Sequence, residues 1–271
     1  MVISGWGDGH FGHSPIVCAR TDSADNADNA DKYRDLMNTP SHLFDNLSLL
    51  AHETSLLMAT AASLDDQAVR RPSLCRGWTQ AHVLSHVARN SDGMGNLVVW
   101  AITGTPRAMY DSPEARDADV AVGATRGAQE ILTDLEDSAA RFAAVAAGLA
   151  GAPEKVEVEM RGGRTVLGGQ LPTLRLMEVV VHHVDLDAGY TFADADPGFV
   201  KRAVANGVGR MTAKADAPAV TLRSDEGETC TIRGGGQVVT GSNAALLLWL
   251  TRGDGAGVSS NAVLPKLPSW G

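Results

Sequence analysis

The segment from Leu171 to Ala188 constrains the fold most, because it places a carboxylate within an otherwise apolar helical pattern. Glu178 is followed by three valines and then by His182, and side chains four residues apart lie on one face of a helix. A carboxylate in apolar surroundings is costly unless it is paired or binds a metal. The segment therefore predicts a helix that carries Glu178 and His182 on one face, where the carboxylate is paired or binds a metal.

A helix predicted from about Thr79 to Trp100 carries the same spacing, because His82 and His86 are also four residues apart. If the two helices pack with these faces together, the carboxylate and one or two imidazoles converge. Oxygen and nitrogen ligands suit a divalent transition metal, zinc first, and three protein ligands leave one coordination position open. The spacing does not rank His82 against His86, and a hydrogen-bonded core histidine is the alternative for each.

The neighbours of these residues bear on the same prediction. Asp185 lies three residues beyond His182, where its carboxylate can accept the second ring N–H of a metal-binding histidine. His183 points about 100° away around the helix, so we do not expect it to be a ligand. The alternative interpretation of Glu178 is a carboxylate on a solvated helix face that pairs with Arg175.

Two arginines are candidates for binding an acidic substrate. Arg116 ends the segment Ser112-Pro-Glu-Ala-Arg in a predicted connection between helices, and Arg252 follows an apolar helical segment. Arginine is suited to two-point recognition of a carboxylate. The alternative for each is a solvated surface arginine, and Arg252 would also be favourable simply as a basic residue near the end of a helix.

The predicted elements divide the chain into three parts. Residues 1–40 contain an acidic near-repeat of Ala, Asp and Asn that can bury little surface, so we expect a disordered tail. Residues 41–191 favour an antiparallel four-helix bundle, whose core commonly hosts metal sites. The helices are predicted from residue 41 and at about 79–100, 126–149 and 171–188, with a small hairpin over 155–167.

Residues 192–271 differ in character and predict a small α+β domain. Alternating apolar residues and an acidic turn favour strands over helices in the middle of this region. The signals are a helix at about 197–212, strands at 218–223, 228–233 and 238–240, and a helix at 244–250.

Composition narrows the classes of partner. The 271-residue chain has a formal net charge of −9 and no basic stripe to neutralise phosphates, so nucleic acid is not expected as a partner. No run of about eighteen apolar residues predicts a membrane span. Cys18, Cys75 and Cys230 are odd in number and widely spaced, so they do not predict a disulfide framework, and we expect a reducing, cytoplasmic location.

The sequence contains no obvious nucleophile of its own. It has no phosphate-binding glycine loop, no Gly-x-Ser-x-Gly elbow, and no cysteine with a histidine nearby in the sequence. A metal centre in such a chain must activate a water or an external ligand such as a thiol.

Four segments, in order along the chain, resemble the signatures of the mycothiol-dependent maleylpyruvate isomerase family. The first runs from Gly-Trp-Thr through His86 to Arg-Asn, and the second is Met-Tyr-Asp-Ser-Pro-Glu-Ala-Arg. The third is Glu-Val-Val-Val-His-His-Val-Asp-Leu, and the fourth is Arg-Gly-Asp-Gly. They occupy residues 77–90, 109–116, 178–186 and 252–255. The resemblance covers most of the chain from about residue 41, and its metal triad is shared with the wider DinB-like superfamily.

This resemblance implies a DinB-like four-helix bundle followed by a small sterol-carrier-like α+β domain. It implies that His86, Glu178 and His182 hold Zn²⁺ or another divalent metal, and that mycothiol is a recycled thiol cofactor. Arg116 and Arg252 would line a pocket for a small anionic substrate. The implied reaction is the cis–trans isomerisation of maleylpyruvate to fumarylpyruvate. The main departure from this resemblance is His183, where a related protein has a small residue.

Two alternatives remain compatible with the sequence. A mycothiol S-transferase or thiol-dependent hydrolase would keep the triad and change the substrate pocket. A non-catalytic protein that binds a metal and a small ligand would instead have a filled fourth coordination position, and His82 as a fourth ligand would favour it.

Overall fold

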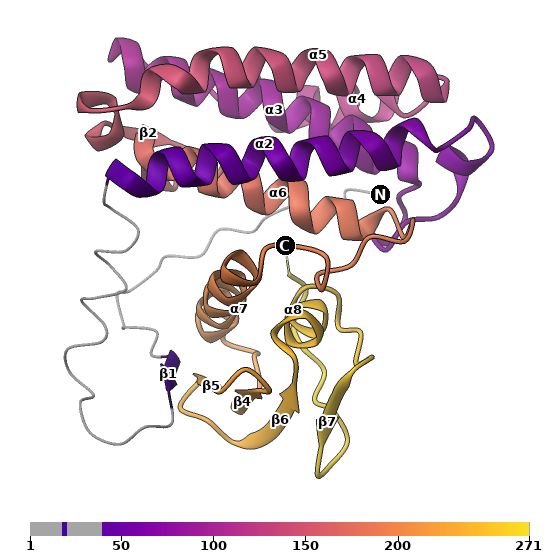
Figure 1. Ribbon diagram of the computed structural model, residues 1–271, viewed down its shortest axis with the longest axis vertical. Helices are drawn as coiled ribbons and strands as arrows, with labels where there is room; N and C mark the ends of the chain where they lie inside the picture. The colour runs from indigo at the N-terminus through magenta and orange to yellow at the C-terminus, as the bar shows by residue number, and fades with distance from the viewer. Residues whose placement is uncertain (1–17, 21–39, 271) are drawn as a thin grey trace. The chain divides into compact units, whose positions relative to one another are not determined.

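The computed structural model describes residues 18–20 and 40–270 and divides into two compact units, each described separately (Figure 1). One unit comprises residues 37–190, and the other comprises residues 191–271 together with 1–36. The predicted disordered tail, residues 1–40, lies outside the described residues except for 18–20 and 40. As predicted, the chain is mainly helical with a small sheet region in its C-terminal part.

Four long helices form the first unit. Helix α3 packs against both α5 and α6, and α2 packs against the same two helices, so that the four enclose an apolar interior (Figure 1). This interior is built from leucine, valine and alanine, as the low aromatic content requires. The helices are α2 (Pro40–Ala62), α3 (Gln80–Thr103), α5 (Ala128–Ala146) and α6 (Leu171–Asp185).

A fifth helix, α4 (Pro113–Gly123), lies where the sequence predicted only a connection. Ser112 caps it by accepting a hydrogen bond from the backbone N–H of Ala115 at 3.0 Å, and Pro113 occupies the first turn. Only Arg116, Val120 and Gly123 of this helix are buried, so it has too few apolar side chains to produce a clear helical periodicity. The prediction that Arg116 lies in a connection was therefore wrong.

Short elements link the long helices. A two-stranded hairpin, β2 (Glu157–Glu159) with antiparallel β3 (Thr165–Leu167), forms within the predicted hairpin region. Its turn contains Gly162 and Gly163 at φ +84° and +81°, a conformation that glycine adopts without steric cost. The single-turn helices are η1 (Ala68–Arg70), η2 (Ala147–Leu149), η3 (Ala152–Lys155) and η4 (Gly168–Gln170).

The second unit is a five-stranded sheet with two helices. The strand order is β1-β5-β4-β6-β7, and neighbouring strands are antiparallel except for the parallel pair β4 and β6. Helices α7 (Pro197–Thr212) and α8 (Asn243–Arg252) pack on each other and on the sheet. The strands are β1 (Cys18–Arg20), β4 (Val220–Ser224), β5 (Glu228–Ile232), β6 (Gln237–Gly241) and β7 (Val258–Ser260), of which β1 and β7 were not predicted.

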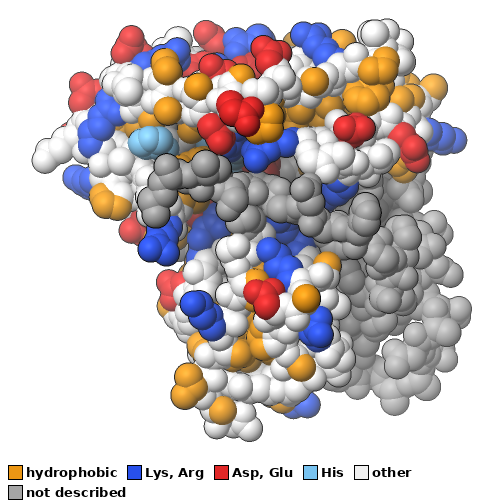
Figure 2. All heavy atoms as spheres, turned by 180° about the vertical axis from the view of Figure 1, so that it is seen from behind, with side chains coloured by type: hydrophobic (Ala, Val, Ile, Leu, Met, Phe, Trp, Pro, Cys, Tyr) orange, Lys and Arg blue, Asp and Glu red, His pale blue; other side chains and the backbone are white. Residues whose placement is uncertain are grey.

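The structure also bears on the predictions about the cysteines and about membrane spans. Cys230, on β5, is disulfide-bonded, a feature that the odd number and wide spacing of the cysteines did not predict. Within residues 18–20 and 40–270, no helix combines the length and apolar character needed to cross a membrane. On the face shown in Figure 2, acidic and basic side chains are interspersed over the helical unit.

Candidate metal centre

Three predicted residues converge between α3 and α6. His86 comes from α3, and its Nε2 lies 3.1 Å from Oε2 of Glu178 on α6. His182, one turn after Glu178, places its own Nε2 3.6 Å from the same oxygen. The two imidazole rings meet edge to face with centroids 4.5 Å apart. One donor atom from each residue therefore lies within 4.8 Å of the other two.

These separations fit a divalent metal. Zinc bonds to nitrogen and oxygen are about 2.0–2.2 Å, so two donor atoms at tetrahedral angles lie roughly 3.4 Å apart. The measured Nε2–Oε2 distances of 3.1 and 3.6 Å bracket this value. His86 and His182 are 3% and 7% exposed, so their rings are held by packing. We refer to His86, Glu178 and His182 as the triad.

The orientation of the His182 ring is set by a carboxylate behind it. Nδ1 of His182 lies 2.8 Å from Oδ2 of Asp185, which is fully buried on the same helix face. Sγ of Cys75 lies 3.2 Å from the same oxygen. With Nδ1 bound to Asp185, Nε2 is directed at Glu178, which is the arrangement that commonly supports metal-binding histidines. The predicted position of Asp185 behind His182 is thus found in the structure.

Arg116 on α4 lies against the other histidine. Its Nη2 is 2.6 Å from Nδ1 of His86, its Nη1 is 2.6 Å from Oδ1 of Asp117, and its guanidinium lies over the Trp78 ring. A guanidinium only donates, so Nδ1 of His86 is the acceptor and Nε2 carries the ring proton, which it donates to Glu178. A metal on Nε2 would require this proton to leave and Arg116 to release Nδ1.

The surroundings of His86 and Glu178 lower the pKa of both groups, so one is neutral and the other is charged. Burial lowers the pKa of His86 to about 4, and the nearby charges of His182 and Arg116 act in the same direction. Burial by itself would raise the pKa of Glu178. Hydrogen bonds and charge from His182 and His86 outweigh burial and hold that pKa well below its ordinary value. At neutral pH His86 is therefore neutral and Glu178 is ionised.

The pKa of His182 shifts in the opposite direction to that of His86. Burial disfavours its cation, but hydrogen bonds with Asp185, Cys75 and Glu178 outweigh that effect. They hold the pKa of this imidazole well above its ordinary value. In the absence of metal, His182 is thus the positively charged imidazole of the triad, and a metal that binds its Nε2 must displace the Nε2 proton.

Two residues near the triad have environments that the sequence did not reveal. Tyr110 shares a hydrogen bond with Arg116, and burial together with the charge of Glu178 raises the pKa of Tyr110 to about 12. Arg175 is buried and donates to the carbonyl of Val87 at 2.9 Å and to Oδ1 of Asn90 at 2.7 Å. Its hydrogen bonds thus join α6 to α3, in contrast to the alternative in which it pairs with Glu178 on a solvated face.

The two other histidines that the sequence singled out have structural partners. Nδ1 of His82 accepts from the backbone N–H of Thr79 at 3.3 Å, which closes a capping box at the start of α3, and it also lies 2.8 Å from Oγ1 of Thr79. Nε2 of His183 lies 2.7 Å from Oγ1 of Thr60, and its ring stacks on Tyr190 with centroids 3.6 Å apart. Neither side chain belongs to the triad.

Arg252 belongs to the other compact unit. It is the last residue of α8, where its Nη1 donates to the carbonyl of Thr251 at 2.8 Å. Its role as a substrate-binding residue stays a prediction.

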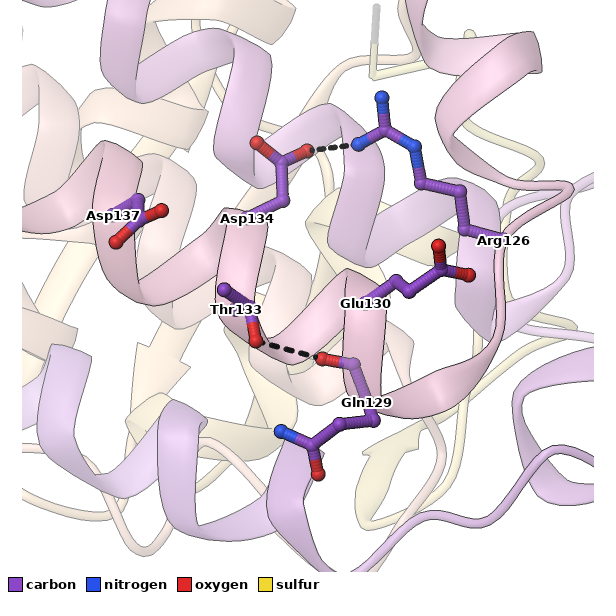
Figure 3. Close-up of a pocket in the computed structure, with 6 residues that line it drawn as sticks. All are labelled: Arg126, Gln129, Glu130, Thr133, Asp134 and Asp137. Carbon is purple, nitrogen blue, oxygen red and sulfur yellow. Dashed lines mark hydrogen bonds and ion pairs between the residues drawn. The ribbon is translucent and has the colours of Figure 1, made fainter.

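An open hollow of about 520 Å³ lies at the start of α5 and contains no triad residue (Figure 3). Asp134 in this hollow binds Arg126 at 3.1 Å and also pairs with Arg89, while Oγ1 of Thr133 donates to the carbonyl of Gln129 at 3.0 Å. Because the Asp134 carboxylate is paired with two arginines and Oε2 of Glu130 accepts from the backbone N–H of Gly127, the hollow is a hydrogen-bonded surface feature and a weaker candidate than the triad.

Comparison with known proteins identifies the family of the chain. A family model described as the mycothiol maleylpyruvate isomerase N-terminal domain matches residues 50–187, slightly more than half of the chain. The chain belongs to the mycothiol maleylpyruvate isomerase family. This confirms the resemblance that the signature segments indicated, and all three triad residues lie within the matched region of this family member.

Solved structures agree with this assignment. A crystal structure of the mycothiol-dependent maleylpyruvate isomerase is 29% identical, with a TM-score of 0.80 over 84% of this chain and 97% of the other. A second structure, of a histidine-to-alanine mutant of that enzyme, gives the same values. No curated protein matches this family member in sequence.

Proposed function

We propose that this chain catalyses the mycothiol-dependent cis–trans isomerisation of maleylpyruvate to fumarylpyruvate. The observation that carries the proposal is the convergence of His86, Glu178 and His182 beside the guanidinium of Arg116. Family membership and the similarity to the isomerase structures support it. We also propose that the helical unit is a DinB-like four-helix bundle, that residues 192–271 are of the sterol-carrier type, and that the protein is cytoplasmic.

The triad would hold Zn²⁺ or another divalent metal. Two neutral imidazoles and one carboxylate leave a net charge of 2 − 1 = +1 on a zinc site, with one position open. A bound divalent ion favours the thiolate form of mycothiol, a nucleophile whose reversible addition to a cis double bond permits rotation about that bond.

The residues around the triad prepare the site for an anionic substrate. Arg116 can transfer a donor from Nδ1 of His86 to a substrate oxygen without losing its ion pair with Asp117, because these contacts use different terminal nitrogens. Tyr110 stays protonated at neutral pH, since its pKa is raised to about 12, and can donate to the same developing negative charge. Arg252 is proposed as a second carboxylate-binding residue.

Asp185 contributes indirectly. By accepting from Nδ1 of His182 it fixes the imidazole tautomer that leaves Nε2 available. The ring of Trp78 lies 5.5 Å from that of His86 and under the guanidinium of Arg116, and so shields this side of the triad from water. His82 is not among the clustered donor atoms of the triad, and this supports a site whose fourth coordination position is not filled by His82.

The decisive experiment is to follow maleylpyruvate by absorbance with purified protein, with and without mycothiol, before and after chelation. Isomerisation that requires both thiol and metal is expected. Turnover that persists after complete metal removal would refute the proposal. Metal binding without isomerisation, combined with transfer of mycothiol to an electrophile, would identify an S-transferase instead.

A matched variant tests whether the planar donor geometry of Arg116, rather than its positive charge alone, is needed for catalysis. Arg116→Lys keeps a positive charge but loses the planar pair of donors. We expect kcat/KM to fall by roughly 100-fold or more, the effect of losing an oxyanion donor, while metal content stays unchanged. Unchanged kcat/KM would remove Arg116 from the proposed mechanism.

A further inference from the structure

A second set of donor atoms lies on the side of His182 that faces away from Glu178. Oδ2 of Asp185 is 2.8 Å from Nδ1 of His182 and 3.2 Å from Sγ of Cys75. One donor from each of these three residues lies within 4.8 Å of the other two. Asp185 is fully buried, whereas Cys75 is half-buried and is not disulfide-bonded. Sulfur, nitrogen and oxygen donors therefore meet at a place that solvent can reach through Cys75.

The backbone holds Cys75 in register with the end of α6. The N–H of Leu74 donates to the carbonyl of Asp185 at 2.9 Å, so the residue before Cys75 is tied to α6. The N–H of Cys75 donates to Oγ of Ser73 at 3.2 Å, and its carbonyl accepts from the N–H of Trp78 at 2.9 Å. The position of the thiol is thus fixed on both sides along the chain.

The donor distances are close to those of a tetrahedral metal site. With zinc–sulfur bonds of about 2.3 Å and zinc–nitrogen or zinc–oxygen bonds of about 2.0–2.2 Å, donors lie roughly 3.4–3.6 Å apart. The present Nδ1–Oδ2 and Sγ–Oδ2 distances of 2.8 and 3.2 Å would each have to lengthen by less than about 1 Å to reach these values. A thiolate and a carboxylate would neutralise a divalent cation, 2 − 2 = 0, and a thiolate ligand selects soft metals.

We propose that Cys75, Asp185 and Nδ1 of His182 form a second metal site, which takes a thiophilic divalent cation such as Cd²⁺ or Zn²⁺ in competition with the triad. Binding forms metal–sulfur, metal–nitrogen and metal–oxygen bonds and releases the protons of the thiol and of Nδ1 to solvent. The site shares His182 with the proposed catalytic centre but does not depend on isomerase activity.

Competition follows from the chemistry of one imidazole. A neutral imidazole has one unprotonated nitrogen, so His182 can offer Nε2 to the triad or Nδ1 to the second site. Asp185 is shared as well: it accepts the Nδ1 proton in one arrangement and is a metal ligand in the other. A thiophilic cation at the second site therefore removes the support that the triad needs.

Cadmium is the probe for the test, since its thiolate complexes absorb in the ultraviolet through sulfur-to-metal charge transfer. Cd²⁺ is titrated into the metal-free, full-length protein, and bound metal is measured after dialysis. We expect the wild-type protein to bind about one ion per chain and to show the thiolate band. Absence of the band from the wild-type protein, or about two bound ions per chain, would overturn the proposal.

Two variants identify the residues that produce the cadmium–thiolate absorbance band. Glu178→Gln disables the triad and should keep both the band and about one bound ion, whereas Cys75→Ser should lose the band and bind its ion at the triad. A band that persists in Cys75→Ser would place the thiolate elsewhere and refute the site. If Cys75→Ser binds no metal while the wild-type band is present, the second site stands and the proposed triad fails, so the two proposals are separable. If a variant does not fold, the absorbance band and the number of ions bound by the wild-type protein still test the proposal.

Discussion

Helix α6 carries two adjacent histidines whose surroundings differ in kind. His182 directs Nε2 toward Glu178 and Nδ1 toward Asp185, so both ring nitrogens face carboxylates. His183 contacts the hydroxyl of Thr60 and stacks on the ring of Tyr190, and both of these groups are neutral. Both residues are buried, at 7% and 1% exposure. Burial therefore does not separate the proposed metal ligand His182 from His183, whereas the charge of the groups described around each ring does.

The difference has an energetic consequence. Carboxylates around His182 create a place where positive charge is stabilised, as a proton or as a metal ion. The contacts of His183 with Thr60 and Tyr190 hold α6 against α2 and the segment that follows α6. Changes near His182 should thus alter metal affinity, and changes near His183 should alter the free energy of unfolding.

The largest effect is expected from the same contrast on α3. His86→Ala removes a triad ligand, whereas His82→Ala removes only a helix cap. Metal affinity should fall by more than about 100-fold when His86→Ala is made in a Cys75→Ser background, which lacks the proposed second site; this exceeds the usual effect of changing a supporting residue. His82→Ala should keep its metal and lose about 1 kcal/mol of stability. Metal titration and thermal unfolding of both variants check this prediction. Equal loss of metal in the two variants would contradict the assignment of His86 as a ligand and His82 as a helix cap.

Asp185→Asn tests the carboxylate behind His182. The amide preserves the shape of the side chain but removes the negative charge that supports the imidazole. Metal affinity at the triad should fall by roughly 10–100-fold while the ligands remain in place. Equilibrium competition with a chelator measures the change. An unaltered affinity would show that Asp185 has only a packing role.

The pH dependence of metal binding provides the next test. The pKa of His182 is raised by its carboxylate partners, so a metal must displace its proton, and affinity should rise about tenfold per pH unit until the pH exceeds that pKa. His86, with a pKa of about 4, is already neutral and adds nothing in this range. Calorimetry in buffers of different ionisation enthalpy should detect about one proton released per metal near neutral pH. Metal binding without proton release would contradict this assignment.

The stability of the metal-free protein should respond to both histidines with opposite signs. The raised pKa of His182 means that the folded state holds its proton more tightly, so this contribution is full below the ordinary pKa and is lost as the pH rises through the raised value. The lowered pKa of His86 means that the unfolded state binds more protons between about pH 4 and 6.5, so its contribution rises with pH across that window.

The sequence predicted the triad because its ligands lie on two strongly patterned helices. Spacing by four residues placed Glu178 and His182 on one face, and the family resemblance, not the spacing, selected His86 over His82. The capping role of His82 could have been anticipated, since a Thr three residues before a polar side chain at a helix start is a recognisable signal.

Other features required the third dimension. Helix α4 is mostly exposed and lacks apolar periodicity, so only its start signals at Ser112 and Pro113 were readable. Tyr110 lies near the triad because its ring packs against Gly93, where an added Cβ would lie 2.8 Å from the tyrosine Cε1. Cys75 approaches Asp185 across 110 residues of sequence, and no local pattern encodes such a contact.

The smallest effect is expected on the His183 side, where Tyr190→Phe keeps the ring that stacks on His183 and deletes only the hydroxyl. That hydroxyl donates to Oε2 of Glu53 at 2.5 Å, and Glu53 is only 2% exposed. Losing a donor to a buried carboxylate should cost about 1–3 kcal/mol, which shifts the melting temperature by roughly 2–4 °C per kcal/mol in a protein of this size. Metal affinity should stay within about twofold, because the triad keeps all of its partners. A variant that lost metal but not stability would reverse the contrast between the two faces of α6, since it would show that the neutral contacts of His183 also set the metal site.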